Sequence, residues 1–320
     1  MSEAEEDALF SDVEAEEAEE EAQPPGAEQV PVVPLTQEII GPALSLLCRT
    51  GNGLGHAFVR MDLKNIGLTD IAALCSYIHL RFLDLSNNHL NDLSPLASLT
   101  QLLWLKVDNN VVECLKSQPF AELTYLQWLS LSMNRIPDLQ GLVGPALESL
   151  NLIGNKIQSM TDLQSDCFVN LVTLELRGNQ LDTTDGINLP NLRKLYLAQN
   201  VIKRLEGLEK LERLTTLHLR DNQLDTLDGL NPNMKCLQYL NVRSNAIVDE
   251  KGLLSLAFVS KTLQALVLSD NPLVETTDYR LMVLSLLPQL EQLDKDLVSQ
   301  EERTDARERL KQLQEEELEP

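Results

Sequence analysis

Residues 80–90 read LRFLDLSNNHL, and this stretch fits the pattern L-x-x-L-x-L-x-x-N-x-L. The same frame returns eight more times along the chain, as LLWLKVDNNVV (102–112), LQWLSLSMNRI (126–136), LESLNLIGNKI (147–157), LVTLELRGNQL (171–181), LRKLYLAQNVI (192–202), LTTLHLRDNQL (214–224), LQYLNVRSNAI (237–247) and LQALVLSDNPL (263–273). The motif asparagines follow one another at intervals of 21 to 26 residues: Asn88, Asn110, Asn134, Asn155, Asn179, Asn200, Asn222, Asn245 and Asn271. A period of this length is typical of a protein in which each repeat is one structural unit.

Each copy of the motif predicts one short strand. Alternate residues of a strand point to opposite faces, so the leucines of L-x-L turn inward and the x residues turn outward. A lone repeat cannot bury its leucines, and the repeats must therefore stack. The amide of the motif asparagine can satisfy backbone groups of its own turn and of the next. The pattern predicts an α/β leucine-rich-repeat solenoid, with a curved parallel sheet on the concave face and short 3₁₀ or helical returns.

Segments of different composition flank the nine repeats. A weaker copy of the motif precedes them, with Ile66 in place of the asparagine and the apolar positions filled by Phe58, Met61, Leu63 and Leu68. We predict five segments, in chain order: a disordered acidic tail (1–33), a cap helix and loop (34–57), the repeats (58–278), a carboxy-terminal repeat cap (279–298) and a charged helix or tail (299–320).

The amino-terminal cap and the charged carboxy-terminal segment both carry helix signals. TQEIIGPALSLLCR (36–49) places Thr36 at the helix start, and its apolar stripe consists of Ile40, Leu44 and Leu47. The alternative is that Gly41 and Pro42 break this helix. Ser299 and Glu302 have the spacing of a capping box, which predicts a second helix from about Ser299. That helix has a narrow apolar stripe of Ala306, Leu310 and Leu313. The stripe has two interpretations, a solvated tail helix or a docking helix for a partner.

Composition excludes several classes of function. The net charge of −23 argues against a general nucleic-acid binder, because a polyanion would be repelled. The twelve acidic residues of segment 1–28, which has no basic residue, indicate a solubilising tail or an acidic arm for a basic partner. There is no run of 18 apolar residues and no basic-then-apolar leader, so we expect no membrane span and no secretion. The odd number of scattered cysteines, five, favours a reducing intracellular compartment.

Catalytic motifs are missing from the sequence. It contains no G-x-S-x-G elbow, P-loop, H-E-x-x-H or C-x-x-C. Of the four histidines, His218 alone is predicted to project from a strand, where an ordinary surface role is expected. We therefore expect no catalytic residue, cofactor, metal or small-molecule substrate, and predict a protein that binds other proteins.

The outward strand positions are the predicted binding face. Phe82, Trp104 and Trp128 fall at the same position of three consecutive strands, where their rings should touch. Arg177, Arg220 and Arg243 share another column, and the residues beside them are Lys194, Tyr196 and Tyr239. We expect an aromatic pocket at one end and, at the other, a basic strip for an acidic partner, because Trp, Tyr and Arg dominate interface hot spots. The alternative is that some of these side chains pack against their neighbours on the face.

Stretches between and before the repeats are more specific than the repeats themselves. SLLCRTGNGLGHAFVR (45–60), YIHLRFLDLSNNHLNDLSPL (77–96) and LDKDLVSQEER (293–303) resemble a family of axonemal leucine-rich-repeat proteins associated with radial spokes. The resemblance implies a structural protein of motile cilia and sperm flagella, in the cytoskeleton of the cytoplasm, that supports sperm motility. It implies that the partners are other axonemal proteins, radial-spoke head components among them, and it supplies no catalytic residues.

Two other functions stay open at this point. A repeat period near 22 also resembles regulatory subunits of protein phosphatases. Acidic nuclear leucine-rich-repeat adaptors that act on histones are a further class, although their acidic run is longer and follows the repeats, whereas here it comes first. An enzyme is the least supported reading, because no constellation of catalytic residues is present.

Overall fold

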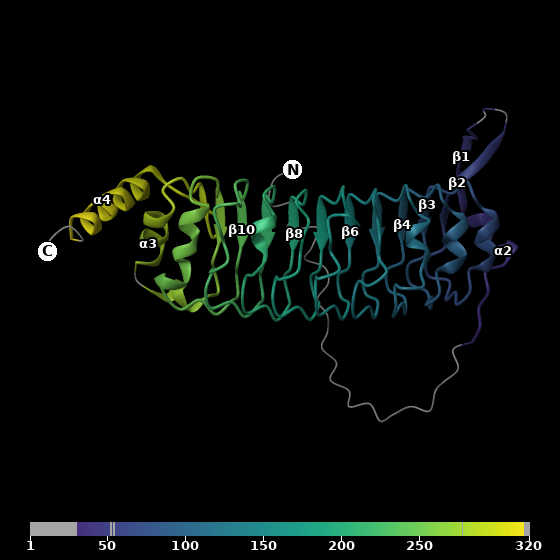
Figure 1. Cartoon of the computed structure of the whole chain (residues 1–320), viewed down its shortest axis with the longest axis horizontal. Coiled ribbons are helices and arrows are strands. Elements are labelled where there is room, and N and C mark those ends of the chain that lie inside the picture. Colours follow the sequence, from purple (N-terminus) through teal and green to yellow (C-terminus); the bar gives the residue numbers. More distant parts are fainter. Residues whose placement is uncertain (1–30, 52, 54, 277, 317–320) are drawn as a thin grey trace, which may run out of the picture. The chain divides into compact units, whose positions relative to one another are not determined.

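The structure is a computed structural model that describes residues 31–316 except 52, 54 and 277. The chain divides into two units, Met1–Val32 and Val33–Pro320, and the second contains all the elements described below. The predicted acidic tail (1–33) lies outside the described residues as far as residue 30. Within the second unit the repeats stack in a single row (Figure 1).

The row of repeats forms one sheet whose strands follow sequence order. Neighbouring strands pair in parallel, except that the first two and the last two form antiparallel hairpins. This arrangement confirms the predicted solenoid. The strands are β1 (Leu44–Arg49), β2 (His56–Asp62), β3 (Phe82–Asp84), β4 (Trp104–Lys106), β5 (Trp128–Ser130), β6 (Ser149–Asn151), β7 (Thr173–Glu175), β8 (Lys194–Tyr196), β9 (Thr216–His218), β10 (Tyr239–Asn241), β11 (Ala265–Val267), β12 (Gln292–Leu293) and β13 (Asp296–Leu297).

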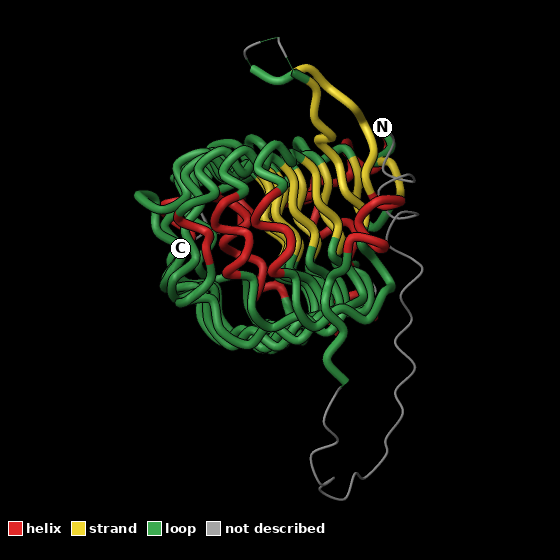
Figure 2. Tube along the Cα trace, turned by 90° about the vertical axis from the view of Figure 1, so that its right-hand side faces the viewer, coloured by secondary structure: helices red, strands yellow, loops and turns green. Residues whose placement is uncertain are grey.

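Short helical turns return the chain from one strand to the next, as predicted. Two begin with proline and a third has proline at its second position, and proline fixes φ at a helical value and needs no partner for an N–H group. The 3₁₀ turns are Ala72–Ser76, Ser94–Ser98, Pro119–Ala121, Leu208–Lys210, Glu250–Phe258 and Pro272–Glu275. The α-helices lie at the ends of the row: α2 (Gln37–Ala43), α3 (Tyr279–Leu286) and α4 (Gln300–Glu316). Figure 2 shows the strands of consecutive repeats stacked in one file.

The core consists of the motif leucines of every repeat. In the first full repeat Leu83, Leu85 and Leu90 are all 0% exposed, and their counterparts in the later repeats are buried in the same cluster. Each such side chain contributes on the order of 1.5–3 kcal/mol by leaving water. The repeats therefore hold together through aliphatic packing between neighbours.

The motif asparagines form a buried ladder between repeats. The Asn110 amide nitrogen donates to the carbonyls of Leu85 (3.0 Å) and Val107 (3.1 Å), and its oxygen accepts from the N–H of Leu90 (2.9 Å). The other eight motif asparagines are buried and repeat this pattern. The predicted direction was wrong: the amide joins its own turn to the preceding repeat, because Leu85 and Leu90 lie one repeat earlier.

The amino-terminal cap differs from the prediction. The helix ends at Ala43, just after Pro42, and Leu44–Arg49 forms strand β1 instead. Ile40 is buried as expected, but Leu47 is exposed, because β1 pairs with β2 and turns this side chain outward. Phe58 is also exposed and does not belong to the core, since it lies opposite Leu47 in the hairpin. Thr36 occupies the N-cap position without a hydrogen bond from its side chain.

The carboxy-terminal cap contains a partial repeat, and the predicted capping box follows it. Strand β12 continues the parallel sheet beside β11. The N–H of Ser299 donates to a Glu302 carboxylate oxygen (2.8 Å), and the N–H of Glu302 donates to the Ser299 hydroxyl (3.2 Å). Helix α4 packs on α3 through the buried Ala306, and the Arg280 guanidinium pairs with Glu302. The predicted stripe is therefore used within the chain at Ala306, and the side chain of Leu313 lies outside the described residues.

Candidate protein-binding face

Strand register brings Phe82, Trp104 and Trp128 into one row, as predicted from the repeat. Trp104 lies opposite Phe82 on one side and Trp128 on the other. The two indole rings stack with centroids 4.7 Å apart and planes 7° apart. Both tryptophans are half-buried, because the leucines next to them in sequence occupy the core side of the strands. The stack is therefore presented on the outward face.

The two indole rings of the stack are in contact, as the repeat register predicts. Aromatic rings in contact leave no room for a third group between them, and at 4.7 Å the indoles touch. Their outer faces and edges remain for contact with another molecule. We call Trp104 and Trp128 the tryptophan pair.

A second ring stack lies on the later strands. His218 is between Tyr196 and Tyr239, with centroid separations of 4.7 Å and 4.9 Å and interplanar angles of 30° and 28°. Tyr196 and Tyr239 are predicted site residues, whereas the sequence predicted an ordinary surface role for His218. The position of His218 on β9, between the tyrosine-bearing strands β8 and β10, could have predicted this ring stack.

The predicted basic strip is compensated by acidic neighbours. Arg177 lies 3.5 Å from Glu175, Arg220 lies 3.0 Å from Asp221, and Arg243 lies 2.6 Å from Asp270, each distance joining a guanidinium nitrogen to a carboxylate oxygen. The arginines are in the expected column, and Lys194 is on β8 as expected. Sequence patterning missed the pairing because two of the acids, Asp221 and Asp270, are at turn positions with positive φ.

Glu175 is the most buried carboxylate of this region. Burial raises its pKa to about 7, and the nearby positive charges of Arg177 and Lys194 oppose the shift. Near neutral pH the group is therefore divided between its charged and neutral forms. The strand face has one carboxylate whose charge depends on pH in the physiological range.

Two hollows lie away from the ring stacks. One, of about 460 Å³, follows the turns after the early strands, and its lining residues include His89, Met133 and Arg135. Exposed asparagines at positive φ join across this rim, with Asn87 bonded to Asn65 (2.7 Å) and Asn109 bonded to Asn87 (2.9 Å). These amides satisfy one another, which makes the rim a structural feature.

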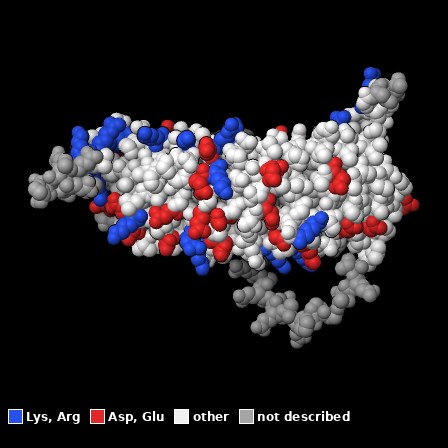
Figure 3. Space-filling model, in the orientation of Figure 1, with Lys and Arg blue, Asp and Glu red and all other residues white. Residues whose placement is uncertain are grey.

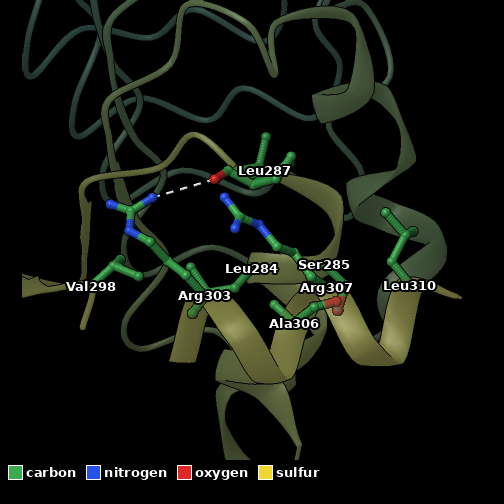
Figure 4. Close-up of a pocket in the computed structure, with 9 residues that line it drawn as sticks. Leu284, Ser285, Leu287, Val298, Arg303, Ala306, Arg307 and Leu310 are labelled. Carbon is green, nitrogen blue, oxygen red and sulfur yellow. Dashed lines mark hydrogen bonds between the residues drawn. The ribbon is translucent and has the colours of Figure 1, made fainter. Parts of the chain in front are cut away.

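The other hollow lies between α3 and α4 (Figure 4). Its volume of about 10 Å³ is room for roughly one water molecule. Arg303 reaches across it to donate to the carbonyl of Pro288 (3.3 Å). The space is a packing gap under the docked helix and is too small for an organic ligand.

The described residues also bear on metals and membranes. Among them, no group of three or more His, Cys, Asp or Glu side chains is placed to hold a metal ion. None of the helices in the described ranges combines the length and the apolar character that a membrane span needs. All five cysteines are free thiols.

Comparison with known proteins places the chain in a family. A family model described as Leucine-rich repeat matches residues 165–319, and a second, Leucine Rich Repeat, matches residues 79–102. The chain is 51% identical to leucine-rich repeat-containing protein 23 of Homo sapiens over 290 residues, which cover 90% of this chain and 83% of that protein. The chain belongs to the leucine-rich repeat-containing protein 23 family. The relative in Mus musculus, of the same name, is 49% identical over 98% of this chain and 92% of its own length.

Solved structures support the fold. The functional domain of InlJ from Listeria monocytogenes matches with a TM-score of 0.50 and 20% identity, over 77% of this chain and 56% of that one. The TLR13–ssRNA13 complex matches with a TM-score of 0.54 and 26% identity, over 69% of this chain and 33% of that one. Both likenesses support the fold of the chain described here.

Proposed function

We propose that this chain is a non-catalytic protein-binding scaffold of the axoneme of motile cilia and flagella. In this proposal it is a structural component of radial spokes and supports sperm flagellar motility, with other axonemal proteins, including radial-spoke head components, as partners. Membership of the leucine-rich repeat-containing protein 23 family supports the setting, through the axonemal role that the family resemblance implies. The observation that carries the binding role is the tryptophan pair on the outward face.

The geometry suits a scaffold for a physical reason. The buried asparagine ladder and the leucine core hold each strand at a set distance from the next, so the outward side chains are positioned before a partner arrives. A preorganised face loses little conformational entropy on binding. Stacked, half-buried tryptophans offer a large apolar area with few rotatable bonds, which is typical of interface hot spots.

Localisation tests the proposal most directly. The tagged full chain, expressed in ciliated or sperm cells, is expected in the axoneme. Replacing Trp104 and Trp128 by alanine is expected to remove that signal while the circular dichroism spectrum is retained. Tyr125→Ala is the matched control, because Tyr125 is an exposed aromatic residue outside the strands and its loss should leave localisation unchanged.

Other outcomes of localisation and co-purification would favour the two alternative functions, a nuclear adaptor or a phosphatase regulatory subunit. A diffuse nuclear signal would overturn the axonemal proposal and favour an acidic nuclear adaptor. Co-purification with a phosphatase whose activity the chain alters would favour a regulatory subunit. Axonemal localisation that survives loss of the tryptophan pair would retain the setting and reject this pair as the anchor.

A further inference from the structure

The β1–β2 hairpin is the part of the sheet that departs most from the repeat. It projects beyond the row of strands in two perpendicular views (Figures 1 and 2). Leu46 is 54% exposed, Leu47 is 57% exposed and Phe58 is 43% exposed. Leu46 also has a φ of +58°, a backbone conformation that L-residues rarely adopt. Three large apolar side chains therefore face solvent on one short hairpin.

Two of these exposed residues, Leu47 and Phe58, share a face with the tryptophan pair. Leu47 lies opposite Phe58, and two residues further along β2 is Arg60, on the same side of the strand. Arg60 lies opposite Phe82, the first member of the row that continues to the tryptophan pair. Leu47 and Phe58 therefore lie on the same face as this row, beside its first member and displaced along the strands toward the β1–β2 turn. We call Leu47, Phe58 and the row from Arg60 to Trp128 the hairpin face.

The hairpin is basic in a chain that is strongly acidic. Residues 44–61 contain Arg49 and Arg60 and no acidic residue, whereas the whole chain has a net charge of −23. In the described part of the chain neither arginine has an ion pair, in contrast to Arg177, Arg220 and Arg243. Figure 3 shows blue and no red side chains on the projecting hairpin. Arg49 and Arg60 are thus the cations of the outward face that no acid in the described residues compensates.

From this combination we infer that the hairpin face binds an acidic segment of a partner protein that also carries large apolar side chains. The inference rests on the proposed scaffold function and names the chemistry of one partner. Carboxylates of the segment would pair with Arg49 and Arg60, and its apolar side chains would cover Leu47, Phe58 and the tryptophan pair. The acidic-partner site expected at the basic strip is thereby assigned to the opposite end of the face.

Charge argues against a second copy of the chain as the occupant. Symmetric pairing of two hairpins would bring Arg49 and Arg60 close to the same residues of the other copy, and like charges in contact are unfavourable. Pairing with the remainder of another chain is possible only where acids lie beside exposed apolar groups. Sedimentation of the free protein therefore forms one arm of the test.

Selection from a random peptide library displayed on phage tests the inference with the full chain. Peptides are selected on the wild-type protein and counter-selected on a Phe58→Ser, Arg60→Glu variant. The expected peptides combine Asp or Glu with Leu, Phe or Trp. In fluorescence anisotropy a synthetic copy of such a peptide should lose about tenfold or more in affinity with either single substitution. Its affinity should also fall as salt rises from about 0.05 M to about 0.5 M.

Matched controls separate the hairpin from surface charge and surface hydrophobicity in general. Arg204→Glu reverses an exposed arginine of a return segment, and Val248→Ser removes an exposed apolar side chain near β10. Both should keep the affinity within about twofold. The Phe58 and Arg60 side chains are exposed, so their variants should fold, which circular dichroism checks.

Several results would overturn the inference. Selected peptides that bind the counter-selection variant equally well, or that are neutral or basic, would reject the acidic occupant. A Phe58-dependent dimer in sedimentation velocity would assign the face to a second copy. Phe58-dependent binding to phosphatidylserine vesicles, without selection of acidic peptides, would assign it to a membrane surface. The scaffold proposal is judged by localisation, so the two can fail separately.

Discussion

The indole rings of Trp104 and Trp128 lie face to face on neighbouring strands, with centroids 4.7 Å apart and planes 7° apart. Parallel pairing of β4 with β5 brings the two side chains to the same height, and the buried leucines beside them hold both strands in place. The contact is therefore a direct product of repeat register. It also sets the first of four predictions.

The tryptophan pair should show measurable coupling. In a double-mutant cycle with Trp104→Ala and Trp128→Ala, we expect an interaction free energy of about 0.5–1.5 kcal/mol, because stacking adds to the effect of burial. Urea unfolding of the four proteins measures it. A cycle between Trp104 and Tyr239, on a distant strand, should be additive within about 0.5 kcal/mol. Additivity in both cycles would mean that the stack contributes nothing to stability.

Removing one rung of the asparagine ladder should destabilise the solenoid. The Asn155 amide donates to the carbonyls of Leu131 (2.9 Å) and Leu152 (3.0 Å) and accepts from the N–H of Ile136 (3.1 Å). Asn155→Ala leaves these buried backbone groups without partners, so we expect a loss of about 2–4 kcal/mol in the free energy of unfolding. The exposed Asn170 donates to one carbonyl (2.8 Å), and Asn170→Ala should cost less than about 1 kcal/mol. Equal losses in the two variants would contradict this account.

The buried Glu175 should make stability depend on pH in a direction opposite to that of a carboxylate whose pKa is lowered on folding. Its pKa in the folded chain is raised to about 7, mainly by burial, above the value of about 4.3 expected in the unfolded chain. The folded state therefore binds more protons between these values, and this group stabilises the fold progressively as pH falls from above 7 toward 4.3. At higher pH the charged form is a cost.

Replacing Glu175 by glutamine isolates that effect from other titrations. Glu175→Gln should be more stable than wild type by about 1–3 kcal/mol at pH 8, and the difference should shrink toward pH 5. Chemical denaturation at several pH values measures the difference directly. Glu113→Gln, at an exposed carboxylate paired with Arg135, is the matched control for the loss of one surface charge. A constant difference for the Glu175 variant across this range would refute the assignment.

Asp294 should stabilise the carboxy-terminal end of the repeat stack. Its carboxylate accepts the N–H groups of Leu268 (2.6 Å) and Ser269 (2.8 Å) and the hydroxyl of Tyr279 (2.5 Å). Asp294→Ala should lower the free energy of unfolding by about 1.5–3 kcal/mol and speed hydrogen exchange at Leu268 and Ser269 first. The neighbouring Asp296 is exposed, so Asp296→Ala should leave exchange there unchanged. Unchanged protection in the Asp294 variant would show that the cap closes by other contacts.

The burial of each repeat position could be predicted because it depends on residues close to it in the sequence. The alternation within L-x-L and the regular return of asparagine determine which side chains are buried, and stacking then places position beside position. This is why Phe82, Trp104 and Trp128 were expected in one row and lie in one row. The same reasoning fails at the first strand, where LSLLCR has apolar spacing that a helix and a strand can both satisfy.

Contacts made by turn residues were also beyond sequence patterning. Arg243 pairs with Asp270, which is 27 residues away at a turn with positive φ, so a column of arginines read from the strands alone looks more basic than it is. His218 acquires its two tyrosine neighbours from the strands on either side. Ring orientation and ion pairing depend on rotamers, which neighbouring repeats set.

By itself the sequence determined the solenoid, the buried leucines, the asparagine rungs and the membership of each outward column. These features could be predicted because each repeat contacts mainly its neighbours and every repeat uses the same local pattern. The tertiary structure alone decided that Leu44–Arg49 is a strand, that Arg177, Arg220 and Arg243 are paired with acids, and that Leu47 and Phe58 face solvent. Those outcomes depend on which segment pairs with the open edge of the sheet and on which charged side chains lie close together. Both depend on contacts between residues that are distant in the sequence.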